Sequence, residues 1–184
     1  MLGVLKNKVI LMPHSKRWAE EYHKVKEFFM ETFADEILRV EHVGSTAIPG
    51  IMAKPVLDVA VVLKELTEQV FRKMEESGYT YYGEPAPGKY LFILRGKGEK
   101  TLQHVHCYKS SDLTLFYEQI QFRDFLRTHS EYAREYEQLK MGLSLKYFDD
   151  RKQYTAGKQE FFDQIKTLAA QDGETGDPPR HEDR

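Results

Sequence analysis

The chain has 184 residues, of which 41% are hydrophobic and 30% are charged. This length suits one domain with a core of its own. Its 27 lysines and arginines against 29 acids give a formal net charge of -2. This balance excludes a uniformly basic nucleic-acid coat protein and an acidic disordered chain.

A single cysteine, Cys107, excludes an intrachain disulfide framework and a zinc site built from several cysteines. The first residues lack the apolar core and cleavage site of a secretory signal. No run approaches the roughly 18 apolar residues that a membrane-spanning helix needs. We therefore expect a cytoplasmic protein that has no membrane contact.

The first predicted elements are a helix and two strands. A helix is expected to begin at Ser15, because apolar side chains follow at steps of three and four. Its apolar face carries Trp18, Tyr22, Val25, Phe29 and Phe33. A strand over 37–43, a Gly-Ser-Pro break over 44–50 and an almost wholly apolar strand over 55–63 follow.

A helix over 66–77, ended by Gly78, is followed by three strands and three helices. The predicted strands cover 79–82, 89–95 and 101–108, and the turn signals between them favour an antiparallel meander. The predicted helices cover 112–127, 130–148 and 150–170. This order predicts an α+β or mixed α/β fold, with the helices packed on one side of a mixed sheet.

We expect residues 1–170 to form a single domain whose helical C-terminal portion covers 112–170. Residues 171–184 contain no large apolar side chain, so they bury too little surface to offset their ordering entropy. They are therefore predicted to be a flexible tail.

The segment over 41–63 is the most informative for chemistry. Gly44 lets a backbone approach a phosphate without interference from a Cβ, and Ser45 adds a hydroxyl. Asp58 lies inside an apolar strand, where a carboxylate must be paired, hydrogen-bonded or bound to a cation. The alternatives are a plain turn at Gly44 and Ser45, and a structural ion pair between Asp58 and Lys54 or an arginine.

This segment resembles the signature of the nucleotidyltransferase superfamily. There a hydrophobic-Gly-Ser turn precedes an Asp-x-Asp or Asp-x-Glu pair, and a later strand supplies a third acid. The resemblance implies two Mg²⁺ ions that stabilise the attacking and leaving oxygens of phosphoryl transfer. It also implies a nucleotidyltransferase-like mixed sheet, with phosphates held at Gly44 and Ser45 and metal at Asp58.

A closer resemblance is to the GrpB family, whose members belong to that superfamily. It runs from Lys8 to Leu168, nearly the whole predicted domain. The matching stretches are Trp18, EHVGSTAIPGIMAKPVLD, HVHC, FRDFLR, YEQLK and YFDDR.

The sequence departs from the catalytic pattern at Ala60, which takes the place of the second acid. A methyl group cannot bind a metal, so another side chain must complete the site, or the chain binds a nucleotide without transferring it. The resemblance places His104 and His106 where the third acid would come, and their spacing puts both rings on one face of a strand. Asp58, His104 and His106 are therefore the candidate metal ligands, with His42 as a candidate fourth. Cys107 should point to the opposite face.

The expected ion is Mg²⁺ or Mn²⁺, with Zn²⁺ as the alternative that imidazoles prefer. Two histidines in a strand are equally compatible with plain packing, and His42 favours a structural role.

Cations are the other candidates for a site that takes anions. Lys54 and Arg123 fall in matched stretches and are expected to neutralise charge that develops in the reaction. Arg127, Lys140 and Lys158 lie on predicted helices, where solvated surface is the simpler interpretation.

Three functions follow from these residues. The first is metal-dependent nucleotidyl transfer, or binding of a nucleotide or another phosphorylated small molecule, with Asp58, Lys54 and Arg123 as catalytic candidates. The second is a binding or regulatory domain that has lost its chemistry with Ala60. The third is a one-metal hydrolase built on the histidines. The near-neutral charge argues against non-specific nucleic-acid binding.

Overall fold

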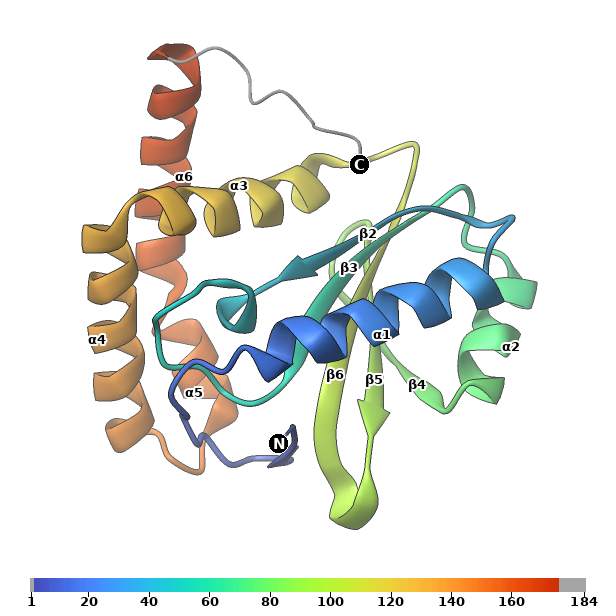
Figure 1. Ribbon diagram of the computed structural model, residues 1–184, viewed down its shortest axis with the longest axis horizontal. Coiled ribbons are helices and arrows are strands. Elements are labelled where there is room, and N and C mark those ends of the chain that lie inside the picture. The colour runs from blue at the N-terminus through green and yellow to red at the C-terminus, as the bar shows by residue number, and fades with distance from the viewer. Residues whose placement is uncertain (1, 176–184) are drawn as a thin grey trace.

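A six-stranded mixed sheet forms the centre of the computed structural model, which describes residues 2–175 (Figure 1). The strands are β1 Val4–Leu5, β2 Ile37–Val43, β3 Leu57–Leu63, β4 Tyr79–Ala86, β5 Lys89–Arg95 and β6 Lys100–Lys109. Five of them lie in the order β2-β3-β6-β5-β4, and β1 pairs with β6. The β3–β6 pair is parallel and the other pairs are antiparallel. The predicted mixed α/β class and the β4-β5-β6 meander are confirmed.

The helices alternate with and follow the strands. They are α1 Arg17–Thr32, the short 3-10 helix η1 Ser45–Ala47, α2 Glu68–Glu76, the short 3-10 helix η2 Lys97–Glu99, α3 Thr114–Thr128, α4 Ser130–Lys146, α5 Arg151–Ala156 and α6 Gln159–Thr175. None of the helices within residues 2–175 is long and apolar enough to cross a membrane.

Alternation of side chains along β3 and β6 gives the sheet two buried faces. Leu57, Val59, Val61 and Leu63 of β3 join Val105 and Cys107 of β6 in a core with α1 and α2. The alternate residues Ala60, Val62 and Tyr108 join Phe116 and Ile120 of α3 in a second core. Cys107 therefore lies on the face predicted for it. The helices cover both faces, so the prediction that they pack on one side is wrong.

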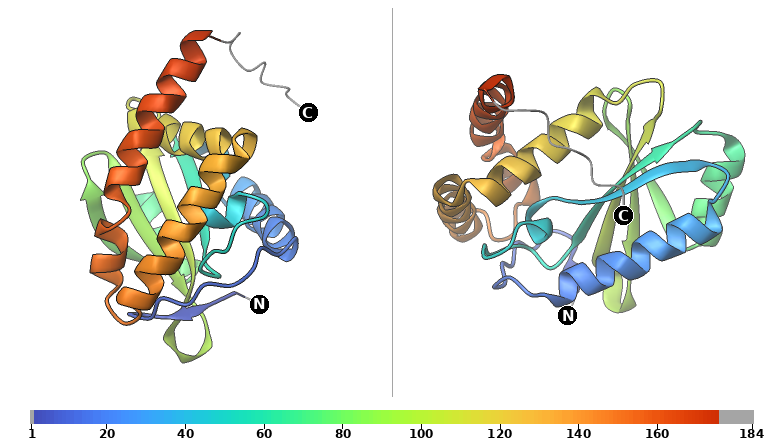
Figure 2. Two further views of the ribbon diagram at one scale, coloured as in Figure 1. Left: turned by 90° about the vertical axis from the view of Figure 1, so that its left-hand side faces the viewer. Right: turned by 45° about the horizontal axis from the view of Figure 1, so that its top comes forward.

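The C-terminal helices form a third group beside the sheet (Figures 1 and 2). A third apolar cluster joins α3, α4 and α6 to the segment after η1 through Ile48, Ile51, Phe125, Tyr136 and Ile165. The cluster is buried because each helix turns an apolar face toward the others. Residues of β3 and β6 and residues of α5 and α6 line the same cavity.

Two boundaries in the C-terminal part differ from the sequence prediction. The single helix expected over 150–170 is divided into α5 and α6 around Gly157. Helix α6 continues to Thr175, so the first residues of the expected tail are helical. The rest of that predicted tail, residues 176–184, lies outside the described residues.

Candidate functional site

The register of the central strands brings one carboxylate and two imidazoles together. Asp58 of β3 pairs with His104 of β6, and Ala60 pairs with His106. Paired positions share a face of the sheet, so all four side chains lie on the face opposite α1. Nδ1 of His104 lies 3.0 Å from Oδ1 of Asp58, and Nε2 of His106 lies 3.5 Å from the same oxygen. The structure therefore brings together the three residues that the sequence predicted as metal ligands.

His104 lies between a carboxylate and a guanidinium. Its Nε2 lies 3.0 Å from Nη2 of Arg151, the first residue of α5. A guanidinium only donates hydrogen bonds, so Nε2 of His104 accepts and Nδ1 carries the proton that is donated to Asp58. Burial lowers the pKa of His104, in keeping with this neutral tautomer. Both ring nitrogens are engaged.

Asp58 packs against the Gly-Ser turn. A Cβ at Gly44 would lie 2.5 Å from Oδ2 of Asp58, and Gly44 has a φ of +69°. Glycine is required there by the Asp58 carboxylate and by the backbone. Burial raises the pKa of Asp58, but hydrogen bonds from His104 and His106 outweigh it and hold that pKa well below its ordinary value. Asp58 is therefore ionised near neutral pH.

His106 is the less constrained of the two imidazoles. Its Nδ1 is buried and has no hydrogen-bond partner among residues 2–175. Burial, followed by the charge of Lys89, lowers the pKa of His106 to about 4, so the ring is neutral near pH 7.

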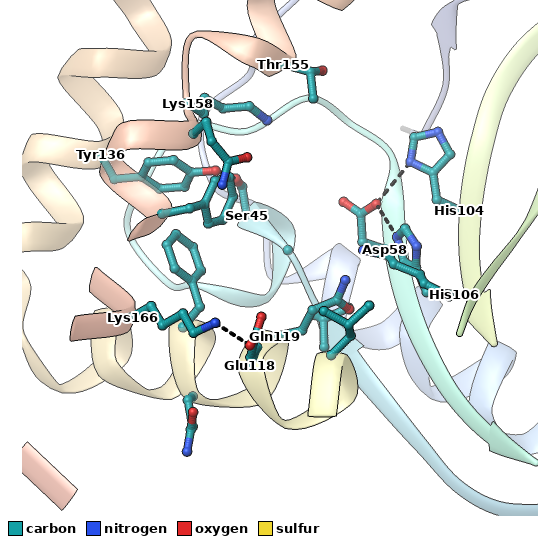
Figure 3. A pocket seen from close by; sticks show the side chains of 18 of the residues that line it. Ser45, Asp58, His104, His106, Glu118, Gln119, Tyr136, Thr155, Lys158 and Lys166 are labelled. Carbon is teal, nitrogen blue, oxygen red and sulfur yellow. Dashed lines mark hydrogen bonds and ion pairs between the residues drawn. The ribbon is translucent and has the colours of Figure 1, made fainter. Parts of the chain in front are cut away.

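These side chains line one wall of a cavity of about 570 Å³ between the sheet and the C-terminal helices (Figure 3). The opposite wall comes from η1, α4 and α6, and Ser45 of η1 and Tyr136 of α4 face Asp58 across the cavity. Oγ of Ser45 donates a long hydrogen bond of 3.4 Å to the Tyr136 hydroxyl. Phe122 and Phe162 add an aromatic surface, with ring centroids 4.3 Å apart. The cavity thus has a charged wall and an aromatic wall.

Cations outnumber acids around the cavity. Its lining includes five of them, namely Lys54, Lys89, Arg151, Lys158 and Lys166. The lining acids are Asp58, Glu118 and Asp163. Lys166 is ion-paired with Glu118, whereas the other four cations have no carboxylate partner within the described chain.

Burial lowers the pKa of two of these lysines, Lys54 and Lys158. Burial, then the charges of Arg151 and Lys158, lowers the pKa of Lys54 to about 7. Burial also lowers the pKa of Lys158 to about 8, although Asp58 opposes the shift. Both ammonium groups lie near the Tyr154 ring, with Nζ at 5.5 Å for Lys54 and 4.9 Å for Lys158. A bound anion would relieve the cost of holding these charges away from water.

The second acid position of the resembled pattern is closed to a metal. Ala60 has 0% exposure and lies in the apolar cluster beneath Phe116. Within residues 2–175 no three His, Cys, Asp or Glu side chains are arranged to hold a metal ion. The donor set therefore does not fit the metal pair that the resemblance implies.

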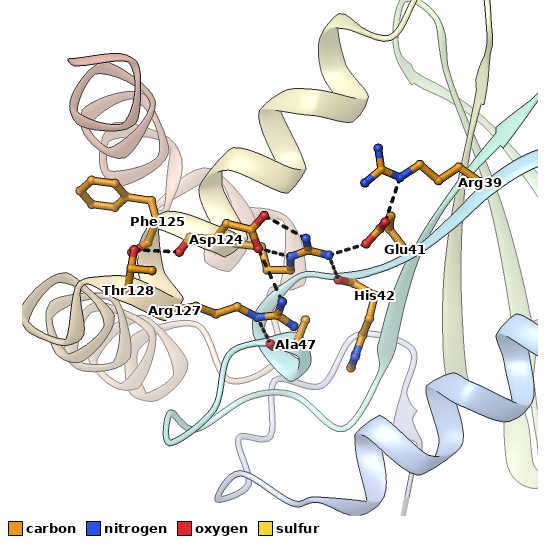
Figure 4. A network of polar contacts seen from close by, with 9 residues as sticks. Arg39, Glu41, His42, Ala47, Asp124, Phe125, Arg127 and Thr128 are labelled. Carbon is orange, nitrogen blue, oxygen red and sulfur yellow. Dashed lines mark hydrogen bonds and ion pairs between the residues drawn. The ribbon is translucent and has the colours of Figure 1, made fainter. Parts of the chain in front are cut away.

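Arg123 does not line the cavity; it clamps α3 to β2. Figure 4 shows the polar network in which Glu41 and His42 of β2 meet Asp124 and Arg127 of α3. It donates hydrogen bonds to Glu41 at 2.8 Å, to the His42 carbonyl at 2.9 Å and to both Asp124 oxygens at 2.7 and 3.0 Å. Arg127 donates to the Ala47 carbonyl at 2.9 Å, at the end of η1. Both arginines therefore hold the strand and turn that carry Gly44 and Ser45.

His42 and Lys140 also lie away from the cavity. The His42 ring stacks on Tyr22 with centroids 4.8 Å apart, and its Nε2 lies 2.9 Å from Oγ1 of Thr46. Lys140 is almost fully buried and donates to the Met52 carbonyl. The structure thus does not bring His42 to the other predicted ligands, and it gives Lys140 a structural contact.

Two of the four cavity cations that lack a carboxylate partner were not singled out from the sequence. Lys89 begins β5 and points to the same side as His106, because paired Leu91 and His106 share that face. Arg151 follows Asp150, whose carboxylate caps α5 by accepting hydrogen bonds from the backbone amides of Lys152 and Gln153. For Lys89, the available signal was the alternation of side chains along its predicted strand. For Arg151, it was the position at a predicted helix start within the matched stretch YFDDR.

Comparisons with known proteins agree with this architecture. The family model described as GrpB protein matches residues 8–167. A Glutamate-rich protein GrpB from Alkalihalophilus pseudofirmus is 34% identical over 173 residues, covering 90% of this chain and 98% of that protein. The UPF0157 protein YqkA from Bacillus subtilis is 34% identical over 158 residues, covering 85% of this chain, which spans only 46% of that protein.

Solved structures extend the comparison. The crystal structure of the conserved protein GrpB from Enterococcus faecalis superposes with a TM-score of 0.79 at 28% identity, covering 89% of this chain and 98% of that one. Terminal uridylyl transferase 4 from Trypanosoma brucei, with bound dUTP, gives a TM-score of 0.48 at 13% identity over 73% of this chain and 46% of that one. Similarity at that level does not bear on the activity of this chain.

The fold is a mixed α/β domain with a cation-lined cavity between its sheet and its C-terminal helices. The chain belongs to the GrpB family.

Proposed function

We propose that this GrpB-family protein binds a nucleotide or another phosphorylated small molecule in the cavity beside Asp58. The observation that carries the proposal is the set of four cations without carboxylate partners that line the cavity, Lys54, Lys89, Arg151 and Lys158. Phosphate groups would supply the missing negative charge and accept several charge-assisted hydrogen bonds.

The aromatic wall supports a ligand with a flat ring. Phe122 and Phe162 face the cavity together with Tyr136. Amide and hydroxyl groups of Gln119, Gln159 and Thr155 line the same space. A base would stack on the aromatic rings while its phosphates reach the lysines, because a cavity of about 570 Å³ holds a small molecule of this size.

Metal-dependent transfer and one-metal hydrolysis, both expected from the sequence, stay predictions. Neither is supported by the arrangement of the donors, because Ala60 is buried and both nitrogens of His104 are engaged. Incubation with labelled nucleoside triphosphates and Mg²⁺ or Mn²⁺ would test transfer, and activity abolished by Asp58→Ala would support it.

Calorimetry tests the proposed binding. Wild-type protein is titrated with ATP, GTP, CTP, UTP and tripolyphosphate, and at least one nucleotide should bind saturably. Lys158→Met should weaken that binding by about tenfold or more, because a charge-assisted hydrogen bond is lost. The control is Lys64→Met, an exposed lysine that does not line the cavity, which should bind as wild type does. No saturable binding of any of these ligands would contradict the proposal.

A further inference from the structure

One oxygen of the Asp58 carboxylate, Oδ1, is engaged by the protein. Oδ1 of Asp58 faces both imidazoles, at 3.0 and 3.5 Å. Oδ2 lies against Gly44, so close that a Cβ there would come within 2.5 Å. A divalent ion bound to Oδ1 of Asp58 would have to displace one of the two imidazole contacts. His104, the closer imidazole, cannot easily move aside, because its Nε2 also accepts a hydrogen bond from Arg151 at 3.0 Å.

The charges nearest Asp58 are positive. Lys54, Lys89 and Lys158 all interact electrostatically with its carboxylate, and they come from three separate parts of the chain. Arg151 adds a fourth, permanent charge. Like charges in a partly desolvated cavity repel strongly, so these groups disfavour a dication beside Asp58. They provide the charge that metal ions would otherwise contribute to a polyphosphate.

We infer that the cavity takes its phosphorylated ligand free of divalent metal, with Lys54, Lys89, Lys158 and Arg151 in the place of the metal pair. The inference rests on the proposed function, because it describes how the same cavity holds phosphate. Two further features agree with it. Ala60 removes the second acid that a metal pair needs, and the position is fully buried in an apolar cluster that includes Phe116.

ATP is the probe for this inference. Its binding to the wild-type protein is measured by calorimetry in excess EDTA and again in excess Mg²⁺. The affinity in EDTA should equal or exceed that in Mg²⁺, because Mg²⁺ cancels charge on the ligand that the four cations recognise. Binding that requires Mg²⁺, or is tenfold tighter with it, would overturn the inference while leaving the proposed function intact. No binding in either condition would reject the proposed function and the inference with it.

Asp58→Asn supplies a second readout that separates the two arrangements. Loss of the acid that interacts with Lys54, Lys89 and Lys158 should keep or increase ATP affinity in EDTA, by up to about tenfold. In excess Mg²⁺, a carboxylate that holds a metal would give the opposite result, a loss of binding in Asp58→Asn. Circular dichroism and the midpoint of thermal unfolding establish that the variant folds. If it does not fold, the comparison of EDTA with Mg²⁺ on wild-type protein still decides between the outcomes.

Discussion

The Cα of Gly44 and the carboxylate of Asp58 lie so close that a Cβ on Gly44 would come within 2.5 Å of Oδ2. The Gly-Ser turn therefore fits against the aspartate of the neighbouring strand, and both residues line the cavity. The sequence suggested that Gly44 makes room for a ligand phosphate. In the structure the space is taken by the protein's own carboxylate.

Gly44→Ala should therefore destabilise the protein more than its backbone angle alone would. Gly50→Ala is the matched control, because Gly50 has a φ of +82° with nothing within 4 Å of an added Cβ. We expect Gly50→Ala to cost about 1 kcal/mol from backbone strain. Gly44→Ala should cost about 2 kcal/mol more, from the clash with Asp58. Urea unfolding measures both, and equal costs would contradict the close packing.

Arg123→Met should lower stability without a specific effect on ligand affinity. Its guanidinium is 7% exposed and holds Glu41, His42 and Asp124. Removal of one partner from a buried ion pair leaves the other charge uncompensated, at a cost of about 3 kcal/mol. ATP affinity of the folded variant should stay within twofold of wild type. A variant with normal unfolding free energy and no ATP binding would restore Arg123 to the site.

Ala60→Asp should not create a metal site. The new carboxylate would enter the buried apolar cluster that includes Val43, Val62, Tyr108 and Phe116. We expect a loss of about 3 kcal/mol or more in the free energy of unfolding. Calorimetry with Mg²⁺ and Mn²⁺ should show no saturable heat. Tight binding of either ion by a variant of normal stability would refute this view of the position.

Acid should destabilise the protein through His42. Burial lowers the pKa of His42 to about 4, from an ordinary value near 6.5. The unfolded chain takes up a proton on His42 below about pH 6.5, whereas the folded protein does not until about pH 4. The free energy of unfolding therefore decreases as the pH is lowered through this window. At pH 5 the loss is about 2 kcal/mol. Urea unfolding at pH 7 and pH 5 should show a smaller pH effect in His42→Gln than in wild type.

Ligand affinity should fall as the pH rises from 7 to 9. Lys54 and Lys158, with pKa values of about 7 and about 8, lose their protons in this range. Asp58 stays ionised and Arg151 stays charged, so the cavity becomes less positive. ATP affinity should drop by about tenfold. Lys158→Arg should lose less ATP affinity over this pH range, because arginine keeps its charge. ATP affinity that does not change with pH in either protein would exclude a contribution from the two lysines.

The shared face of His104 and His106 could be predicted, because alternation along a strand fixes which side chains share a face. Their closeness to Asp58 was implied by the resemblance to the nucleotidyltransferase superfamily. The core of α1 could be predicted for the same kind of reason, since Trp18 and Phe29 are buried at helical spacing. These are local rules, and local rules are readable in the sequence.

The role of the cations could not be predicted in this way. Arg123 and Lys158 were both predicted to lie on helices, yet Arg123 clamps the strand before the Gly-Ser turn and Lys158 lines the cavity from the turn between α5 and α6. Arg151 reaches His104 only because the chain turns between α4 and α5. Which helical side chain meets the sheet depends on tertiary packing between distant segments, and spacing in one segment does not contain that information.

The most direct test of the central claim is a calorimetric titration with ATP in EDTA at pH 7, comparing wild-type protein, the Lys54→Met, Lys158→Met double variant and Lys64→Met. The account predicts saturable one-to-one binding by wild type and by Lys64→Met, with the double variant weaker by about a hundredfold. Equal affinity of the folded double variant and wild type would contradict it.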